Sequence, residues 1–191
     1  MSLHPQQHYS PQEYLELERK AEYKSEYFSG EIFAMSGASE RHNLIVMNVA
    51  AALHNQFRGR PCKVYASDMR VKVSQTGLYT YPDVVAVCEE AQLEDDQLDT
   101  LLNPTVLIEV LSKSTEAYDR GDKAGHYRKL SSLAEYVLIS QDKHHIEHYA
   151  RQPNNHWLLS EASDLKETLV LPSLSASLVL SDVYDRIDMG T

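Results

Sequence analysis

The stretch PTVLIEVLSKST, residues 104–115, decides how this chain folds. Its middle section, V-L-I-E-V-L, is an apolar run of the kind found in strands that are buried on both faces of a sheet. One residue in that run, Glu109, does not fit, because an ionised carboxylate inside a protein is costly unless it is paired, protonated or bound to a metal ion. The run therefore predicts a central strand and indicates a special role for Glu109.

The composition is that of an ordinary globular protein. The chain has 191 residues, of which 42% are hydrophobic and 24% are charged. This length predicts one domain, residues 1–191, with a single core. The formal net charge of −10 argues against broad electrostatic adhesion to DNA, which normally relies on lysine and arginine at the phosphates. Local DNA binding stays compatible with this charge. A group of carboxylates that binds divalent cations adds negative charge to the chain until the cations are bound.

The sequence shows no sign of membrane insertion or export. It has no apolar run of the roughly 20 residues needed to span a bilayer. Its opening, MSLHPQQHYS, has neither the basic region nor the apolar run of a signal peptide. We therefore expect a cytoplasmic protein without membrane contact. The two cysteines, Cys62 and Cys88, lie in apparent strands and form no CxxC pair, so we expect both to be reduced and buried.

Helix caps, turn residues and apolar spacing divide the chain into helices and strands. Helices are expected at residues 11–24, 40–57, 115–130 and 178–186. Strands are expected at residues 62–67, 69–74, 82–88, 106–111 and 134–140, with a hairpin at residues 26–35. Residues 144–151, 157–161 and 167–171 have the pattern of an antiparallel meander. This layout predicts an α/β (mixed α+β) fold, in which helices flank a central mixed sheet and an antiparallel, strand-rich tail follows.

Two carboxylates lie on strands that this layout makes neighbours. Asp83 opens the strand P-D-V-V-A-V, and Glu109 lies in the middle of the next long strand. If the two strands pair, the carboxylates converge, and one of them is protonated unless a cation lies between them. Hard oxygen ligands suit Mg²⁺ or Mn²⁺. Two alternatives stay open: Asp83 simply begins a strand, and Glu109 is a structural acid paired with a lysine or arginine.

A third candidate is Lys123, in the helix that follows Glu109. Asp119, Lys123 and Tyr127 are spaced four residues apart, so they lie close to one helix face. A lysine there can orient an attacking water or stabilise negative charge that develops on a phosphoryl group. The alternative is that Asp119 and Lys123 form an ordinary surface ion pair.

An ordered set of local motifs resembles one family of nucleases. The motifs are Y-K-S-E-Y-F-S-G-E-I, R-H-N, Y-P-D-V-V-A-V, P-T-V-L-I-E-V-L-S-K-S-T, D-R-G-D-K-A-G-H-Y and L-A-E-Y-V-L-I. The pattern resembles the PD-(D/E)XK nuclease superfamily. It looks more closely like a large, mostly bacterial and especially cyanobacterial family of restriction-endonuclease-like proteins, long catalogued as a domain of unknown function. The resemblance covers residues 9–180.

The resemblance implies a restriction-endonuclease-like sheet that carries the active site. It implies that Asp83 and Glu109 bind a divalent metal ion, Mg²⁺ or Mn²⁺. It also implies that Glu26 is a further acidic metal ligand, in preference to Glu31. Four further residues lie at positions typical of the family and are expected beside the site: His42, Asp68, Asp119 and Tyr127. For His42, the alternative is a histidine that merely lies at a helix terminus.

The motif lysine of the superfamily is absent from its usual place. That lysine should occupy position 111, which is Leu111 in this chain. In the family, the lysine role has moved to the following helix, and Lys123 fits that position. Lys113 is the rival, because residues 109, 111 and 113 share a face of an extended strand. We expect Lys123, because the chain is expected to turn near Lys113.

The resemblance and the residues together predict a Mg²⁺-dependent endonuclease that hydrolyses phosphodiester bonds in DNA. The alternative is a catalytically inactive nuclease-fold module, indicated by Leu111 and by the net charge of −10. A third option is a metal-dependent hydrolase of RNA or small phosphorylated molecules. Nucleases that cut both strands commonly act as pairs, so a homodimer is expected. The segment HHIEH, residues 144–148, lacks a zinc-ligand pattern, so we expect no metal there.

Overall fold

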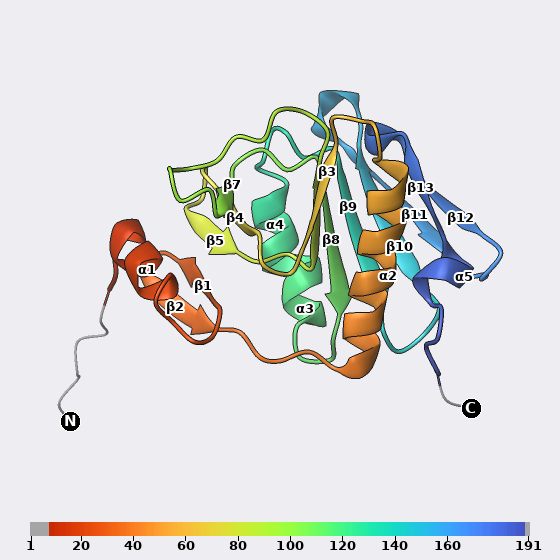
Figure 1. Ribbon diagram of the computed structural model, residues 1–191, viewed down its shortest axis with the longest axis horizontal. Helices are drawn as coiled ribbons and strands as arrows, with labels where there is room; N and C mark the ends of the chain where they lie inside the picture. Colours follow the sequence, from red (N-terminus) through yellow and green to blue (C-terminus); the bar gives the residue numbers. More distant parts are fainter. Residues whose placement is uncertain (1–7, 190–191) are drawn as a thin grey trace.

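A six-stranded mixed sheet forms the centre of the molecule (Figure 1). The computed structural model describes residues 8–189. The strand order is β11-β10-β9-β8-β6-β3. Only β8 and β9 run parallel to each other, and every other neighbouring pair in this sheet is antiparallel. The strands are β3 (Lys63–Ala66), β6 (Val84–Val87), β8 (Val106–Leu111), β9 (Glu135–Ser140), β10 (Ile146–Arg151) and β11 (Trp157–Ala162).

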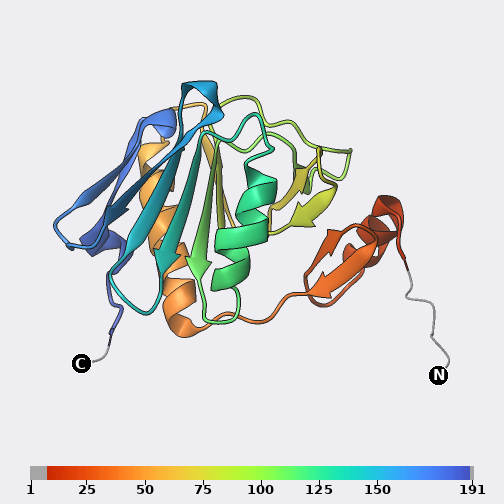
Figure 2. The ribbon, with the colours of Figure 1, turned by 180° about the vertical axis from the view of Figure 1, so that it is seen from behind.

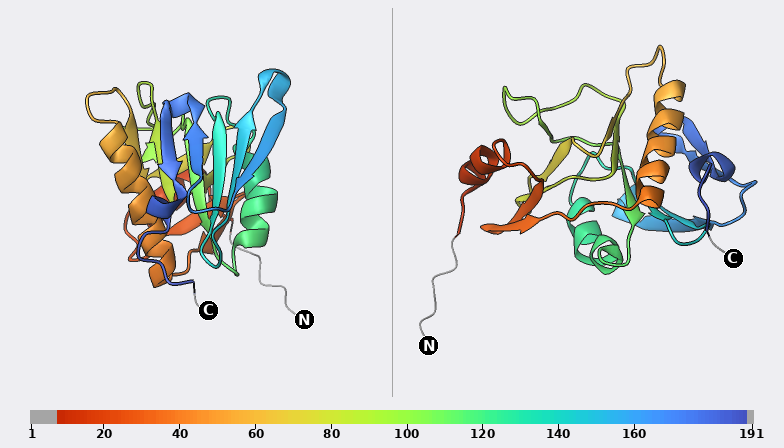
Figure 3. Two further views of the ribbon diagram at one scale, coloured as in Figure 1. Left: turned by 90° about the vertical axis from the view of Figure 1, so that its right-hand side faces the viewer. Right: turned by 60° about the horizontal axis from the view of Figure 1, so that its bottom comes forward.

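Helices cover both faces of this sheet (Figure 3). Helix α2 (Glu40–Gln56) packs on the face to which Val84 and Ile108 point. The opposite face carries Val85 and Leu107 and packs against a broken helix between β8 and β9. Because β6 and β8 are covered on both faces, every residue in them is buried, as the apolar run around Glu109 predicts. The segments of the broken helix are α3 (Glu116–Tyr118), η1 (Asp119–Lys123) and α4 (Ala124–Tyr127).

The first helix and the hairpin form a lobe at one end of the molecule (Figures 1 and 2). Helix α1 (Pro11–Glu18) begins with the expected capping box, in which Ser10 and Glu13 satisfy each other's backbone N–H groups. In the hairpin, Gly30 has a φ of 90°, which favours glycine. The lobe joins a second sheet, of order β2-β1-β5-β4-β7. Its strands are β1 (Ser25–Phe28), β2 (Glu31–Ala34), β4 (Arg70–Val73), β5 (Leu78–Thr80) and β7 (Thr100–Leu101).

Several element predictions were wrong in detail. The structure adds β5 and β7, which have three and two residues and are too short to show a pattern. Helix α1 ends at Glu18 rather than near residue 24, and the third helix is interrupted by the π-helical segment η1 and ends at Tyr127. Gly121 lies inside that π-helical segment, and its low helix propensity weakens the regular helix there.

The expected meander has only two strands in the central sheet, β10 and β11. Strand β12 (Thr168–Leu171) leaves it and pairs with β13 (Ala176–Val179). The chain turns before β12, where the Glu167 carboxylate accepts from the N–H groups of Ser163 and Asp164. Leu169 and Leu171 then pack into the cluster beneath α2. The remaining elements are η2 (Pro153–Asn155), η3 (Pro172–Leu174) and α5 (Leu180–Val183).

The cysteine prediction was wrong. Cys62 and Cys88 form a disulfide, and both residues are only partly buried. Strands β3 and β6 pair antiparallel with Lys63 opposite Val87, so the register places Cys62 directly opposite Cys88 just beyond that pair. The cysteines are 26 residues apart in sequence, and only the pairing of the strands brings them together.

Within residues 8–189, no helix is both long enough and apolar enough to cross a bilayer. The signal-peptide prediction concerns the opening segment, most of which lies outside the described residues. The cytoplasmic location stays a prediction.

Candidate active site

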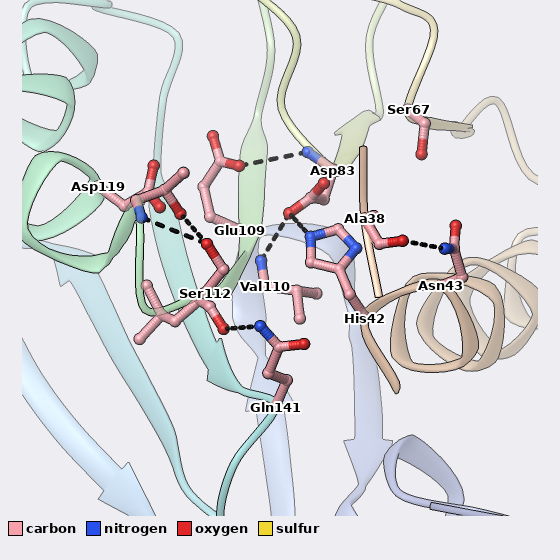
Figure 4. Close-up of polar contacts among 12 residues, drawn as sticks. Ala38, His42, Asn43, Ser67, Asp83, Glu109, Val110, Ser112, Asp119 and Gln141 are labelled. Carbon is pink, nitrogen blue, oxygen red and sulfur yellow. Dashed lines mark hydrogen bonds and ion pairs between the residues drawn. The ribbon is translucent and has the colours of Figure 1, made fainter. Parts of the chain in front are cut away.

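The two predicted strand carboxylates meet at the edge of a cleft (Figure 4). Val84 pairs with Ile108 in the antiparallel register of β6 and β8, so Asp83 lies directly opposite Glu109. The Asp83 carboxylate accepts a hydrogen bond of 2.7 Å from the Val110 N–H. A Glu109 oxygen lies 3.4 Å from the Asp83 amide nitrogen. Each acid therefore contacts the backbone of the other's strand, and this fixes both carboxylates at one point on the sheet.

Lys123 connects this pair to two further acids. Its ammonium nitrogen lies 2.9 Å from Glu109 Oε1, 3.2 Å from Glu26 Oε1 and 3.5 Å from Asp119 Oδ1. All four side chains are buried. The ion pair of Asp119 with Lys123 is therefore internal, and the alternative of an ordinary surface pair was wrong. Glu109 has a lysine partner, as one alternative expected, but three carboxylates share that single ammonium.

Burial and crowding shift the proton affinities of this group. Burial raises the pKa of Glu109 to about 8, since Lys123 only partly offsets it and Asp83 adds to it. Burial also raises the pKa of Asp119. For Lys123, burial opposes the charged form, but Glu109, Glu26 and Asp119 outweigh it and hold the lysine pKa well above its ordinary value. Lys123 therefore stays protonated, and beside it Glu109 has a higher pKa than an ordinary glutamate.

Two hydroxyl groups orient the buried acids. The Tyr127 hydroxyl donates to Glu109 Oε1 over 2.7 Å, from the helix face that also carries Lys123. Thr80, on β5, donates to the Glu26 carboxylate. Sequence reasoning missed Thr80 because β5 is too short to recognise. Tyr118, whose hydroxyl interacts with Glu26, was also missed, because nothing in the pattern sets it apart from other helical tyrosines.

His42 approaches Asp83 from helix α2 (Figure 4). Its Nε2 lies 3.1 Å from Asp83 Oδ2, and its Nδ1 is buried without a hydrogen-bond partner among the described residues. Ser39, the N-cap of α2, accepts a hydrogen bond from the His42 N–H and so fixes the first turn of the helix. His42 therefore lies at a helix terminus and lines the cleft at the same time.

The structure does not bring every candidate into the cleft. Asp68 lies outside it, with a side chain that is 87% exposed and an ion pair of 3.1 Å to Lys24. Glu31 lines a different hollow beside α1. Lys113 is exposed and lines a shallow hollow next to the cleft. Leu111 is buried in the apolar cluster beneath α4. Of the lysines considered, only Lys123 contacts the acids.

The cleft has a volume of about 710 Å³. We call it the acidic cleft, and define it by the side chains that carry its charge and by the rings along its walls. Its charged side chains, together with the imidazole of His42, are Lys24, Glu26, Asp83, Glu109, Asp119 and Lys123. Its walls come from the lobe on one side and from α2 and the broken helix on the other.

A second group of potential ligands lies on β10 and β11. Ligand atoms of His145, Glu147 and Glu161 all fall within 4.8 Å of one another, a grouping that the spacing in HHIEH does not reveal. Glu147 and Glu161 are cross-strand partners, which the sequence alone does not pair. Arg120 already forms an ion pair with Glu147, and His145 lies 3.2 Å from Glu161. Because the Arg120 guanidinium already pairs with Glu147, we assign no metal to this group.

Comparison with known proteins shows the family and the fold of this chain. Residues 11–182 match the Uma2 family, described as "Putative restriction endonuclease". The chain belongs to this family. The resemblance read from the motifs is therefore confirmed at the level of family.

Two relatives align with most of this chain. Two proteins of Synechocystis sp., both named as uncharacterized, are 38% and 36% identical to it. The first match covers 78% of this chain and 84% of the relative, and the second covers 92% and 90%. A crystal structure from Anabaena variabilis, titled as "a putative nuclease belonging to DUF820", matches with a TM-score of 0.74 and 18% identity. It covers 91% of this Uma2 chain and 96% of the other, and shows that the two share a nuclease-like fold.

Proposed function

We propose that this protein is a metal-dependent endonuclease that hydrolyses phosphodiester bonds in DNA. The observation that carries the proposal is the meeting of Asp83 and Glu109 across β6 and β8, with the Lys123 ammonium 2.9 Å from Glu109. Membership of a family described as restriction endonucleases supports the substrate class. The cleft beside these residues supplies the space for a phosphodiester.

The donor set fits a hard divalent cation. Asp83 and Glu109 offer carboxylate oxygens from opposed positions, and Mg²⁺ or Mn²⁺ prefers such ligands. The raised pKa of Glu109 supports the same assignment. The residues around this buried carboxyl do not supply enough positive charge to keep its pKa at the ordinary value. We assign Asp83 and Glu109 as ligands, with Glu26 as the further acid. A bound Mg²⁺ would polarise a phosphoryl oxygen and lower the pKa of a water molecule.

The other residues position the reacting groups. Lys123 keeps its proton and can donate it in a hydrogen bond to the attacking water or to the oxygens of the phosphoryl group. Asp119 and Tyr127 hold Lys123 and Glu109 in place from the same helix. His42 holds the Asp83 carboxylate from α2. Glu109, Asp119, Lys123 and Tyr127 are buried and His42 is partly buried, so the surrounding packing restricts their orientation.

Cleavage assays test the proposal directly. Purified protein should nick or cut DNA with Mg²⁺ or Mn²⁺ but not with EDTA. Asp83→Asn, Glu109→Gln and Lys123→Ala should each lower the rate by at least about 100-fold, the typical loss when one charge-stabilising group is removed. The matched control is Asp68→Asn, whose side chain lies outside the acidic cleft. Equal cleavage by wild type and the three site variants would point to a contaminating nuclease and end the assignment.

A nuclease-fold module without catalysis is the second candidate. Leu111 in place of the motif lysine favours it, as does the net charge of −10. Calorimetric titration with Mg²⁺ and Mn²⁺ separates the two candidates. The endonuclease predicts binding that Asp83→Asn removes, and absence of binding at millimolar metal favours the inactive module.

A homodimer remains part of the proposal, because closed symmetric pairs are the commonest form of soluble oligomers. Light scattering of the purified protein should then give twice the mass of the chain, and a monomer at all concentrations would contradict it. Action on DNA inside the cell agrees with the predicted cytoplasmic location.

A further inference from the structure

The exposed aromatic rings of this protein gather in the acidic cleft. Among the described residues, the large apolar side chains that are most exposed include three aromatic ones: Tyr23 at 67%, Phe33 at 48% and Tyr118 at 37%. All three line the cleft that holds Asp83 and Glu109. The others of this class are aliphatic and lie outside it: Leu17, Met47, Leu98, Leu158, Leu159, Leu165 and Val170. The exposed rings are therefore not scattered as ordinary surface residues would be.

The hairpin register places Phe33 beside the site. Phe33 is the cross-strand partner of Glu26, so the two side chains share one face of the hairpin. The other face carries Tyr27, which stacks on Tyr14 of α1 with ring centroids 5.1 Å apart. That second face is the packed one, whereas the face with Phe33 opens to the cleft. Tyr118 approaches the same carboxylate from the broken helix. Two exposed rings therefore flank Glu26.

The two lysines that line the cleft, Lys24 and Lys123, already form ion pairs with carboxylates. Arg41 and Lys113 line a hollow that continues the cleft, with Ser39, Ser114 and Gln141 shared by both. Within residues 8–189, neither cation forms an ion pair with a carboxylate. Glu40 and Asp142 line the same hollow, so its formal charge is zero. Phosphate contacts alone therefore supply little of the affinity that a nucleic acid needs.

Stacking of bases on aromatic side chains can supply the remaining affinity, but only when the bases are unpaired. Bases in a duplex are stacked on one another and turn their ring faces away from the protein, whereas a single strand offers each face to an aromatic side chain. We propose that the acidic cleft binds single-stranded DNA, whose bases stack on Tyr23, Phe33 and Tyr118 while a phosphodiester lies at Asp83 and Glu109. The inference rests on the proposed nuclease function and names its substrate class. One strand needs one site, so it does not require the homodimer.

Binding can be measured without cleavage. Fluorescence anisotropy with a labelled oligothymidylate, in Ca²⁺ to hold the site without turnover, reports affinity for the single strand. Phe33→Leu and Tyr23→Leu should each weaken binding by about 5- to 150-fold, the loss expected for one stacked base. Phe33→Tyr keeps a ring and should bind like wild type. Met47→Ala and Leu158→Ala are the controls, because these side chains are equally exposed but lie outside the cleft.

The same oligothymidylate annealed to oligoadenylate should bind at least tenfold more weakly. Two phosphate contacts, at Arg41 and Lys113, predict a shallow salt slope of about −1.4 for the single strand. Equal affinity for duplex and single strand, or unchanged binding by both leucine variants, would overturn the inference. Tighter binding of an oligouridylate would overturn the choice of DNA. None of these results alters cleavage that depends on Asp83, so failure of the stacking surface is distinguishable from failure of the nuclease.

Discussion

Replacing Glu109 by glutamine should stabilise the metal-free protein while abolishing cleavage. The carboxyl is 3% exposed and its pKa in the folded protein is about 8, against an ordinary value of 4.5. At pH 7 the protonated form of Glu109 is therefore favoured in the folded protein, whereas the unfolded chain holds the residue ionised. A glutamine has nearly the shape of that protonated acid, and its amide oxygen can still accept from Tyr127.

The size of the effect follows from the pKa difference. A group whose pKa is raised by folding stabilises the folded state below its unfolded pKa of 4.5, and that stability is lost as the pH rises through 8. Between pH 4.5 and pH 7 the loss is about 3 kcal/mol, at about 1.4 kcal/mol for each pH unit. Glutamine does not titrate, so Glu109→Gln should raise the free energy of unfolding by about 3 kcal/mol at pH 7 and by about 1 kcal/mol at pH 5.

Urea unfolding in EDTA, followed by the fluorescence of Trp157, measures both values. Glu147→Gln is the matched control of opposite sign. Burial raises the pKa of Glu147, but hydrogen bonds from Arg120 and Tyr149 outweigh this and leave the pKa below its ordinary value. That substitution should therefore destabilise the protein at pH 7. If Glu109→Gln brings no gain at pH 7, or the same gain at pH 5 and pH 7, the reasoning about the buried carboxyl is wrong.

Three further predictions concern the metal, the disulfide and a buried arginine. Mg²⁺ at 100 times its dissociation constant should stabilise wild type by about 2.7 kcal/mol and should have little effect on Glu109→Gln, as thermal unfolding would show. Reduction of the disulfide, or Cys62→Ser, should lower the free energy of unfolding by roughly 3 kcal/mol. The same urea unfolding midpoint with and without reductant would contradict this. Asp99→Asn removes the 2.8 Å partner of Arg70, which is 2% exposed, and should destabilise by about 3 kcal/mol, whereas Asp68→Asn should change stability by less than about 0.5 kcal/mol.

The two central strands, and the face of each strand that a side chain occupies, could be predicted from short stretches of sequence. The alternation in P-D-V-V-A-V and the apolar run around Glu109 predicted two buried strands, and their pairing brought Asp83 and Glu109 together. The four-residue spacing of Asp119, Lys123 and Tyr127 predicted a shared helix face. In the structure Lys123 and Tyr127 contact Glu109, and Asp119 contacts Lys123. These patterns are readable because strands and helices repeat with periods of a few residues.

Other features depend on contacts between distant segments and leave no local trace. The disulfide follows from the β3–β6 register, the exclusion of Asp68 follows from its pairing with Lys24, and the choice of Lys123 over Lys113 follows from the path of the broken helix. The sequence by itself determined which residue types lie on the central strands and which face of each strand they occupy. Only the tertiary structure decided that Glu26 reaches Lys123 and that Phe33 stands exposed beside it, because the lobe meets the sheet through pairings between segments that are tens of residues apart.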